Sequence, residues 1–164
     1  MTRCGCTKES SSQSEFSPGV VGDSEPIVYA LVNPETSSVK DVSKSRLKQS
    51  DLSVCRAAYT TGKEAHTNIV QSLISKNSNR TEEGFYYAMC SEIRGITLGE
   101  TNQGAFCVID DALEGFESHA HLGYSEPTEP KLKNHRESAR ANLSLLFKRR
   151  GVFKDWNGDP FLVL

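Results

Sequence analysis

The stretch GFESHAHLGYSE, residues 115–126, places two histidines two positions apart behind a glutamate. In a β-strand, successive side chains point to opposite faces of the sheet. Alternation therefore predicts a polar face with Glu117, His119 and His121, which we expect to lie toward solvent or a cleft. The face expected to pack in the core carries Phe116, Ser118, Ala120, Leu122 and Tyr124.

The polar face has the residue types of a metal site. Two imidazoles two apart on a strand can reach one ion, and a carboxylate can be the third ligand. Asp110 and Asp111 follow the apolar run Ala105–Ile109 and can add oxygen ligands. The candidate ligands are Glu117, His119, His121 and Asp110. With zinc or a similar transition metal, such a site would activate water for hydrolysis, but the interpretation we favour is a solvated strand face without a cofactor.

Other apolar runs of strand length predict the rest of the sheet. They are Ile27–Val32, Leu52–Ala57, Phe85–Cys90 and Ala105–Ile109. The sequence Glu92–Ile96 is interpreted as a turn that leaves the third run. At the C-terminus, Asn157-Gly158 separates two further runs, which is a typical hairpin signal.

Two helices are expected. Thr61 and Glu64 have the spacing of a capping box, in which a hydroxyl and a carboxylate satisfy each other's free amides, and an apolar stripe follows over residues 62–76. The second helix begins near Thr128, which can cap it, with Pro130 in its first turn, and ends at the cations before Gly151. Its apolar stripe consists of Ala139, Leu143, Leu146 and Phe147. These elements predict an α+β fold with a mixed or mainly antiparallel sheet of about five to seven strands, two main helices and a C-terminal hairpin.

Composition divides the chain into two parts. Residues 1–24 are rich in serine, glycine and charge, so we expect a flexible N-terminal tail. Residues 25–164 form a single domain in this interpretation. The net charge of -2 hides a strong segregation, because residues 81–126 carry nine acidic groups and one arginine, whereas residues 127–164 carry eight cations and four acidic groups.

The chain has five cysteines, an odd number, and Cys55, Cys90 and Cys107 lie in apolar runs. We interpret these three as small apolar side chains in a reducing compartment. Cys90 or Cys107 with a neighbouring histidine is a weaker alternative, a thiol nucleophile. No apolar run has the roughly 18 residues that a membrane span requires, and the expected location is the cytoplasm.

The basic helix over residues 131–150 suggests a nucleic-acid alternative. Its cations can contact phosphates: Lys131, Lys133, Arg136, Arg140, Lys148, Arg149 and Arg150. They are distributed around the helix instead of along one stripe, however, and the last three already favour the negative end of the helix dipole.

Four strings in this order resemble a group of small bacterial proteins to which we assign no activity. They are Glu25-Pro26-Ile27, Asp51-Leu52-Ser53-Val54, Ala105 to Asp110, and His119-Ala120. The resemblance covers most of residues 25–125 and implies a bacterial cytosolic protein with one compact domain. It carries no functional residue.

The function that these observations favour is binding. We expect an accessory or regulatory protein that acts on another protein, because the sequence offers no complete catalytic constellation and its charges are segregated. The alternatives are a metal-dependent hydrolase that uses the histidine face and a nucleic-acid-associated protein that uses the basic helix. Catalysis of any kind is the less favoured outcome.

Overall fold

A computed structural model of the chain describes residues 6–10, 14–34, 47, 51–70 and 80–154. One five-stranded sheet has the order β3-β1-β2-β5-β4, and all its neighbouring strands are antiparallel. The α+β class and the antiparallel character predicted from the sequence are therefore confirmed. The strands are β1 (Pro26–Pro34), β2 (Asp51–Arg56), β3 (Arg80–Met89), β4 (Phe106–Asp110) and β5 (His119–Tyr124).

The predicted helices are found with different internal structure. The first begins at the Thr61–Glu64 capping box, which is confirmed, and continues as α1 (Gly62–Ala65) and the π-helical turn η3 (His66–Val70). The second consists of the 3-10 turn η4 (Pro130–His135) followed by α4 (Arg136–Arg150), and Gly151 ends it with a φ of 75°. Residues 71–79 and 155–164, with the end of the first predicted helix and most of the predicted hairpin, lie outside the described residues.

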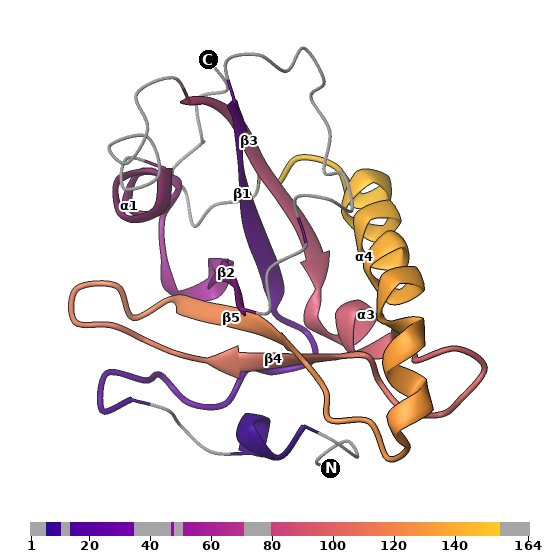
Figure 1. Cartoon of the computed structure of the whole chain (residues 1–164). Helices are drawn as coiled ribbons and strands as arrows, with labels where there is room; N and C mark the ends of the chain where they lie inside the picture. Colours follow the sequence, from indigo (N-terminus) through magenta and orange to yellow (C-terminus); the bar gives the residue numbers. More distant parts are fainter. Residues whose placement is uncertain (1–5, 11–13, 35–46, 48–50, 71–79, 155–164) are drawn as a thin grey trace.

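Helix α4 covers one face of the sheet, and α1 lies on the other side of β1 (Figure 1). The apolar stripe predicted for α4 is buried, because Ala139, Leu143, Leu146 and Phe147 all belong to the main core. Their partners on the sheet include Leu52, Val54, Phe106, Val108, Ala120 and Leu122. The opposite face carries a second cluster around Val28, Cys55 and Phe85, which the short elements η2 (Ala57–Tyr59) and α1 join through Ala57 and Ala65.

A helix replaces the turn predicted for Glu92–Ile96. This helix, α3, spans Cys90–Gly95. Its start is fixed because Glu92 Oε2 accepts a hydrogen bond of 3.0 Å from the Met89 amide. The same carboxylate accepts hydrogen bonds of 2.6 and 2.8 Å from Arg150 at the end of α4. The hydrogen bond from Arg150 lowers the pKa of Glu92, so the link between the two helices is ionic at neutral pH.

Described residues of the segment 1–24, for which composition predicted a flexible tail, make contacts with the sheet and the core. Cys6 is bonded to Cys107 across a sequence separation of 101 residues, and Val21 lies in the main core with 2% exposure. Composition alone misses this arrangement because it depends on pairs that are distant in sequence. In the chain-entropy model, a cross-link closing a loop of roughly 100 residues contributes about 4–5 kcal/mol to stability.

The N-terminal segment also shields an edge of the sheet. Strand β4 is the last strand in the order, so every second backbone amide on it points away from β5. One of these amides, that of Val108, donates a hydrogen bond to a carboxylate oxygen of Glu9. Glu9 belongs to η1 (Thr7–Ser10). We call Cys6–Ser10 the strap, because it lies along β4 and is covalently fixed to it.

Arg56 is the centre of a buried polar cluster. Its guanidinium donates to both oxygens of Glu25 at 2.7 and 2.8 Å and to Asp110 Oδ1 at 3.1 Å. It also donates to the carbonyls of Gly19 and Val20, which fixes the segment leading into β1. The Arg56 side chain is fully buried. A buried cation in such a position holds together three segments that are far apart in sequence.

We predict that Arg56→Ala lowers the free energy of unfolding by about 3–5 kcal/mol, because Glu25 and Asp110 would remain buried without a cation. Urea denaturation followed by circular dichroism measures the loss. Arg149→Ala is the matched control, since that side chain is 72% exposed and its removal is expected to change stability by no more than about 0.5 kcal/mol. Equal stability of the two variants would contradict the prediction.

Candidate functional site

A groove with a volume of about 270 Å³ lies at the end of β5, between the strap and the start of the second helix. It brings together residues from five separate parts of the chain. Its lining consists of Cys6, Thr7, Lys8, Asp51, Cys107, Ile109, His121, Gly123, Tyr124, Glu126 and Arg136. One histidine of the predicted polar face and one arginine of the basic helix therefore meet at the same site.

The floor of the groove results from a missing side chain. Gly123 pairs with Cys107 on β4 and with Asp51 on β2, so these three residues form one row across the sheet. Because glycine has no side chain, the row is hollow in the middle. In the next row, His121 stands between Ile109 and Ser53 and closes the hollow on one side.

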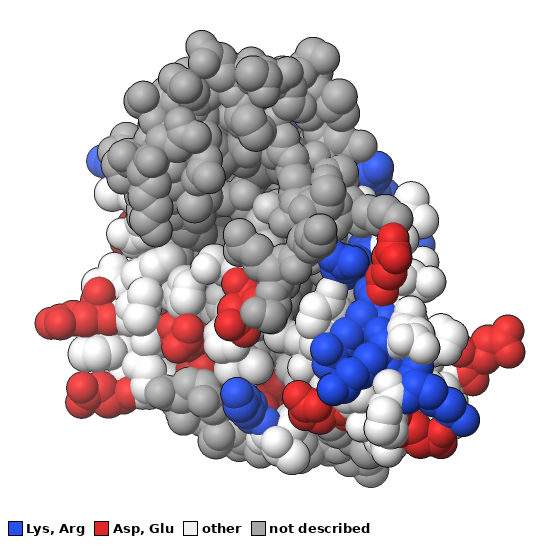
Figure 2. Space-filling view, in the orientation of Figure 1, with Lys and Arg blue, Asp and Glu red and all other residues white. Residues whose placement is uncertain are grey.

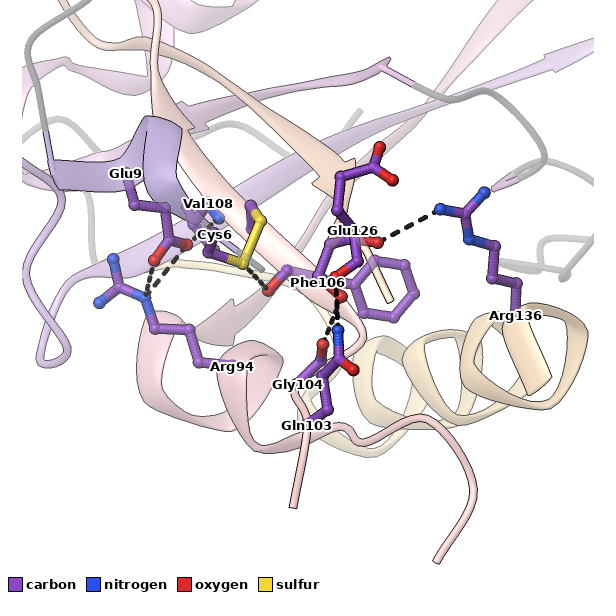
Figure 3. Close-up of a disulfide and its surroundings, with 11 residues drawn as sticks. Cys6, Glu9, Arg94, Gln103, Gly104, Phe106, Val108, Glu126 and Arg136 are labelled. Atoms are coloured by element: carbon purple, nitrogen blue, oxygen red, sulfur yellow. Dashed lines mark hydrogen bonds and ion pairs between the residues drawn. A yellow bond between two sulfur atoms is a disulfide. The ribbon is translucent and has the colours of Figure 1, made fainter. Parts of the chain in front are cut away.

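The strap forms one wall, and the disulfide fixes it. Figure 3 shows the Cys6–Cys107 bond with Glu9 on the strap pointing toward Arg94 of α3. Both oxygens of Glu9 lie 3.4 Å from Arg94 Nε. Cys6, Cys107 and Ile109 make a small apolar cluster of their own beneath the strap. The contacts that hold this wall consequently include one covalent bond, one ion pair, the hydrogen bond from the Val108 amide and a few apolar contacts.

The opposite rim is held by a network of hydrogen bonds around Gln103. Its side-chain amide donates to the Glu126 carbonyl at 2.6 Å and its oxygen accepts from the Thr128 amide at 2.9 Å. Thr128 was predicted to cap the second helix, but in the structure Glu129 precedes η4 and makes no side-chain cap. These hydrogen bonds fix the backbone of the rim beside the groove, and Figure 3 shows Gln103 next to Glu126.

An aromatic ring and a guanidinium lie together at the mouth. Arg136 stacks over the ring of Tyr124, with 4.7 Å between its central carbon and the ring centroid, and donates to the Ser125 carbonyl at 3.2 Å. Burial raises the pKa of the Tyr124 hydroxyl, so it remains protonated at neutral pH. Lys8 and Arg136 supply positive charge to the lining, and Asp51 and Glu126 supply negative charge.

The histidine face of β5 has the predicted alternation. His119 and His121 are half-buried on the side opposite the buried Ala120 and Leu122. Asp111 Oδ2 lies 3.6 Å from His119 Nδ1 and 3.4 Å from His121 Nδ1. His119 Nδ1 also lies 2.7 Å from the Asp111 carbonyl oxygen, which can only accept, so this nitrogen carries a proton.

The structure does not bring the four predicted metal ligands together. Asp110 is bound to Arg56 and points to the other face of the sheet from the histidines, because alternation along β4 places it with Val108. Glu117 is exposed in the turn before β5. Asp111, which the sequence offered as a further ligand, is the acid that stands beside both histidines.

Within the described ranges, one group of three potential ligands has all its donor atoms within 4.8 Å of one another: Cys6, Glu9 and Cys107. The two sulfurs are bonded to each other, and Glu9 is engaged by Arg94 and by the Val108 amide. In this state the cluster offers no thiolate to an ion. Its chemistry is that of a disulfide.

The cations of the basic helix are partly neutralised by neighbours. Arg149 and Arg150 both pair with Glu92, and Lys131 pairs with Glu129. Figure 2 shows Lys and Arg gathered over α4, and acidic side chains projecting on the side where the chain turns between β4 and β5. Acidic side chains also lie beside the basic group in this view, so the two signs of charge meet on this face. Nucleic-acid binding by residues 131–150 stays a prediction.

Of the three cysteines that were expected to be free thiols, one is not. Cys107 is in the disulfide, so it is neither a free apolar side chain nor a nucleophile. Cys55 and Cys90 are free and buried, as predicted. Burial raises the pKa of each of these thiols to about 12, which leaves no thiolate at neutral pH.

No protein-family model, no curated protein and no solved structure matches this chain. Among the described residues, no helix is long and apolar enough to cross a membrane. The resemblance to small bacterial proteins and the cytoplasmic location remain expectations. The function is therefore inferred from the groove itself.

The raised thiol pKa values predict the pattern of alkylation. At pH 8, iodoacetamide should leave Cys55 and Cys90 unmodified in the folded chain and should modify both in 8 M urea, as read by peptide mass spectrometry. Modification requires the thiolate, and a pKa of about 12 keeps both thiols protonated. Rapid modification of either residue without denaturant would show that the site is open to solvent.

Proposed function

We propose that this protein acts by binding another protein, in an accessory or regulatory role, and that the groove receives a side chain of the partner. The observation that carries the proposal is the Tyr124–Arg136 pair beside a wall fixed by a disulfide. Tyrosine and arginine are the side chains that most often dominate the energy of protein interfaces.

The size of the groove favours a segment of a partner. Pockets for drug-sized molecules usually have volumes of roughly 300–1,000 Å³, whereas this groove encloses about 270 Å³. One or two side chains fill such a space. A partner that inserts them would also contact the surface around the groove.

The lining predicts the chemistry of the partner's side chains. Lys8 and Arg136 attract a carboxylate, and Asp51 and Glu126 attract a lysine or arginine. A partner segment with neighbouring acidic and basic residues satisfies both sets. Because the wall and the rim are held in place before binding, little conformational entropy is lost when the complex forms.

The proposal is tested with charge reversals in and near the groove. A partner is first captured from source-cell extract and purified, and its Kd is then measured by calorimetry. Arg136→Glu and Asp51→Lys should each weaken binding at least tenfold, about 1.4 kcal/mol. The expected cause is repulsion of the partner charge that each residue attracts.

Lys133→Glu is the matched control, because it makes the same change of sign at an exposed position three residues before Arg136 and outside the groove lining. It should bind within a factor of two of the unmodified chain. Melting temperatures establish that each variant is folded. A partner held equally well by Arg136→Glu, Asp51→Lys and Lys133→Glu would show that it binds elsewhere and would refute the proposal.

A further inference from the structure

The wall formed by the strap is cross-linked to the edge strand β4 by one covalent bond. Its helical turn has four residues, and a single turn is not stable in isolation. Its non-covalent contacts include the Glu9–Arg94 ion pair, the hydrogen bond from the Val108 amide and the packing of Cys6 against Ile109. By contrast, the segment that follows is fixed at several points, since Val21 is in the core and Asp23 and Glu25 accept backbone hydrogen bonds from α3.

The disulfide is also part of the groove lining. Cys6 and Cys107 both contribute to it, together with Thr7 and Lys8 of the strap. If the sulfur–sulfur bond opens, three of the eleven lining residues lose their cross-link to β4. The floor and the opposite rim keep theirs, because they belong to the sheet and to the network around Gln103. The bond therefore determines whether the wall formed by the strap stays in place opposite the rim.

We propose that the groove is a redox-gated binding site: the oxidised chain binds its partner, and reduction of the Cys6–Cys107 disulfide by a dithiol releases the strap and weakens binding. This inference rests on the proposed function, because it names the regulation of the same site. The reductant is a small or protein dithiol. Cys55 and Cys90 take no part, since both are buried free thiols and neither belongs to the disulfide.

The reaction is an ordinary exchange of sulfur–sulfur bonds. One thiolate of the reductant attacks Sγ of Cys6 or Cys107, which forms a mixed disulfide and expels the other cysteine as a thiolate. The second thiol of the reductant then loses its proton, closes the reductant's own disulfide and expels the remaining cysteine. Each expelled thiolate takes up one proton. The products are two cysteine thiols and the oxidised reductant, a transfer of two electrons and two protons.

The first measurement needs no partner. In a Cys4→Ser background, which removes the thiol two residues before Cys6 in the sequence, amide hydrogen exchange is compared with and without dithiothreitol. EDTA is present throughout, so that no metal can rejoin the thiols. Exchange at Val108 should be at least tenfold faster in the reduced chain, because Glu9 no longer accepts its hydrogen bond. Exchange at Val54, in the central strand β2, serves as the internal reference and should not change.

The second measurement is the Kd for the purified partner of the previous section. Reduction should weaken binding at least tenfold, and the double variant Cys6→Ser, Cys107→Ser should bind weakly in both buffers. If the Val108 amide exchanges at the same rate in both redox states while Arg136→Glu still raises the Kd, the gating alone is refuted. If exchange at Val108 depends on the redox state but neither the Arg136→Glu substitution nor reduction changes the Kd, the proposed function and the gating are both refuted.

Discussion

The covalent bond between Cys6 and Cys107 is the constraint on which the candidate site depends. It joins a short helical turn near the start of the chain to an edge strand that is 101 residues away in sequence. The groove has its second wall because this bond exists, and Glu9 reaches both Arg94 and the Val108 amide because the bond holds the turn in place. Without the bond, the strap would be attached to β4 and α3 by non-covalent contacts such as these alone.

Local patterns predicted the fold well where the decisive interactions are local. The alternation of β5 follows from the geometry of a strand, and the Thr61–Glu64 capping box is a contact between residues three apart. The helix α3 was missed for the opposite reason. Its Glu92 is held by Arg150, and its Arg94 by Glu9 and Asp23, which are residues that no short window of sequence includes.

The candidate site shows the same division between local and distant interactions. The polar face with His119 and His121 was predicted correctly, because alternation requires nothing beyond the strand itself. Asp110, at the end of the preceding strand, was a candidate further ligand for the two histidines, whereas the structure pairs it with Arg56 on the other face of the sheet. Gly123 went unrecognised, although a glycine inside a strand often marks a close approach or a hollow. The link between Cys6 and Cys107 could not be deduced, because five cysteines allow many pairings.

The position of the strap at the beginning of the chain has a consequence for biosynthesis. The strap leaves the ribosome long before Cys107 and β4 are made, so it cannot take its place until most of the sheet has been synthesised. During that interval the outer edge of β4, once formed, presents unpaired backbone groups, and such edges pair readily with strands of other chains. Oxidation of the two cysteines ends this interval. The rate of disulfide formation therefore sets how long each new molecule is exposed to aggregation.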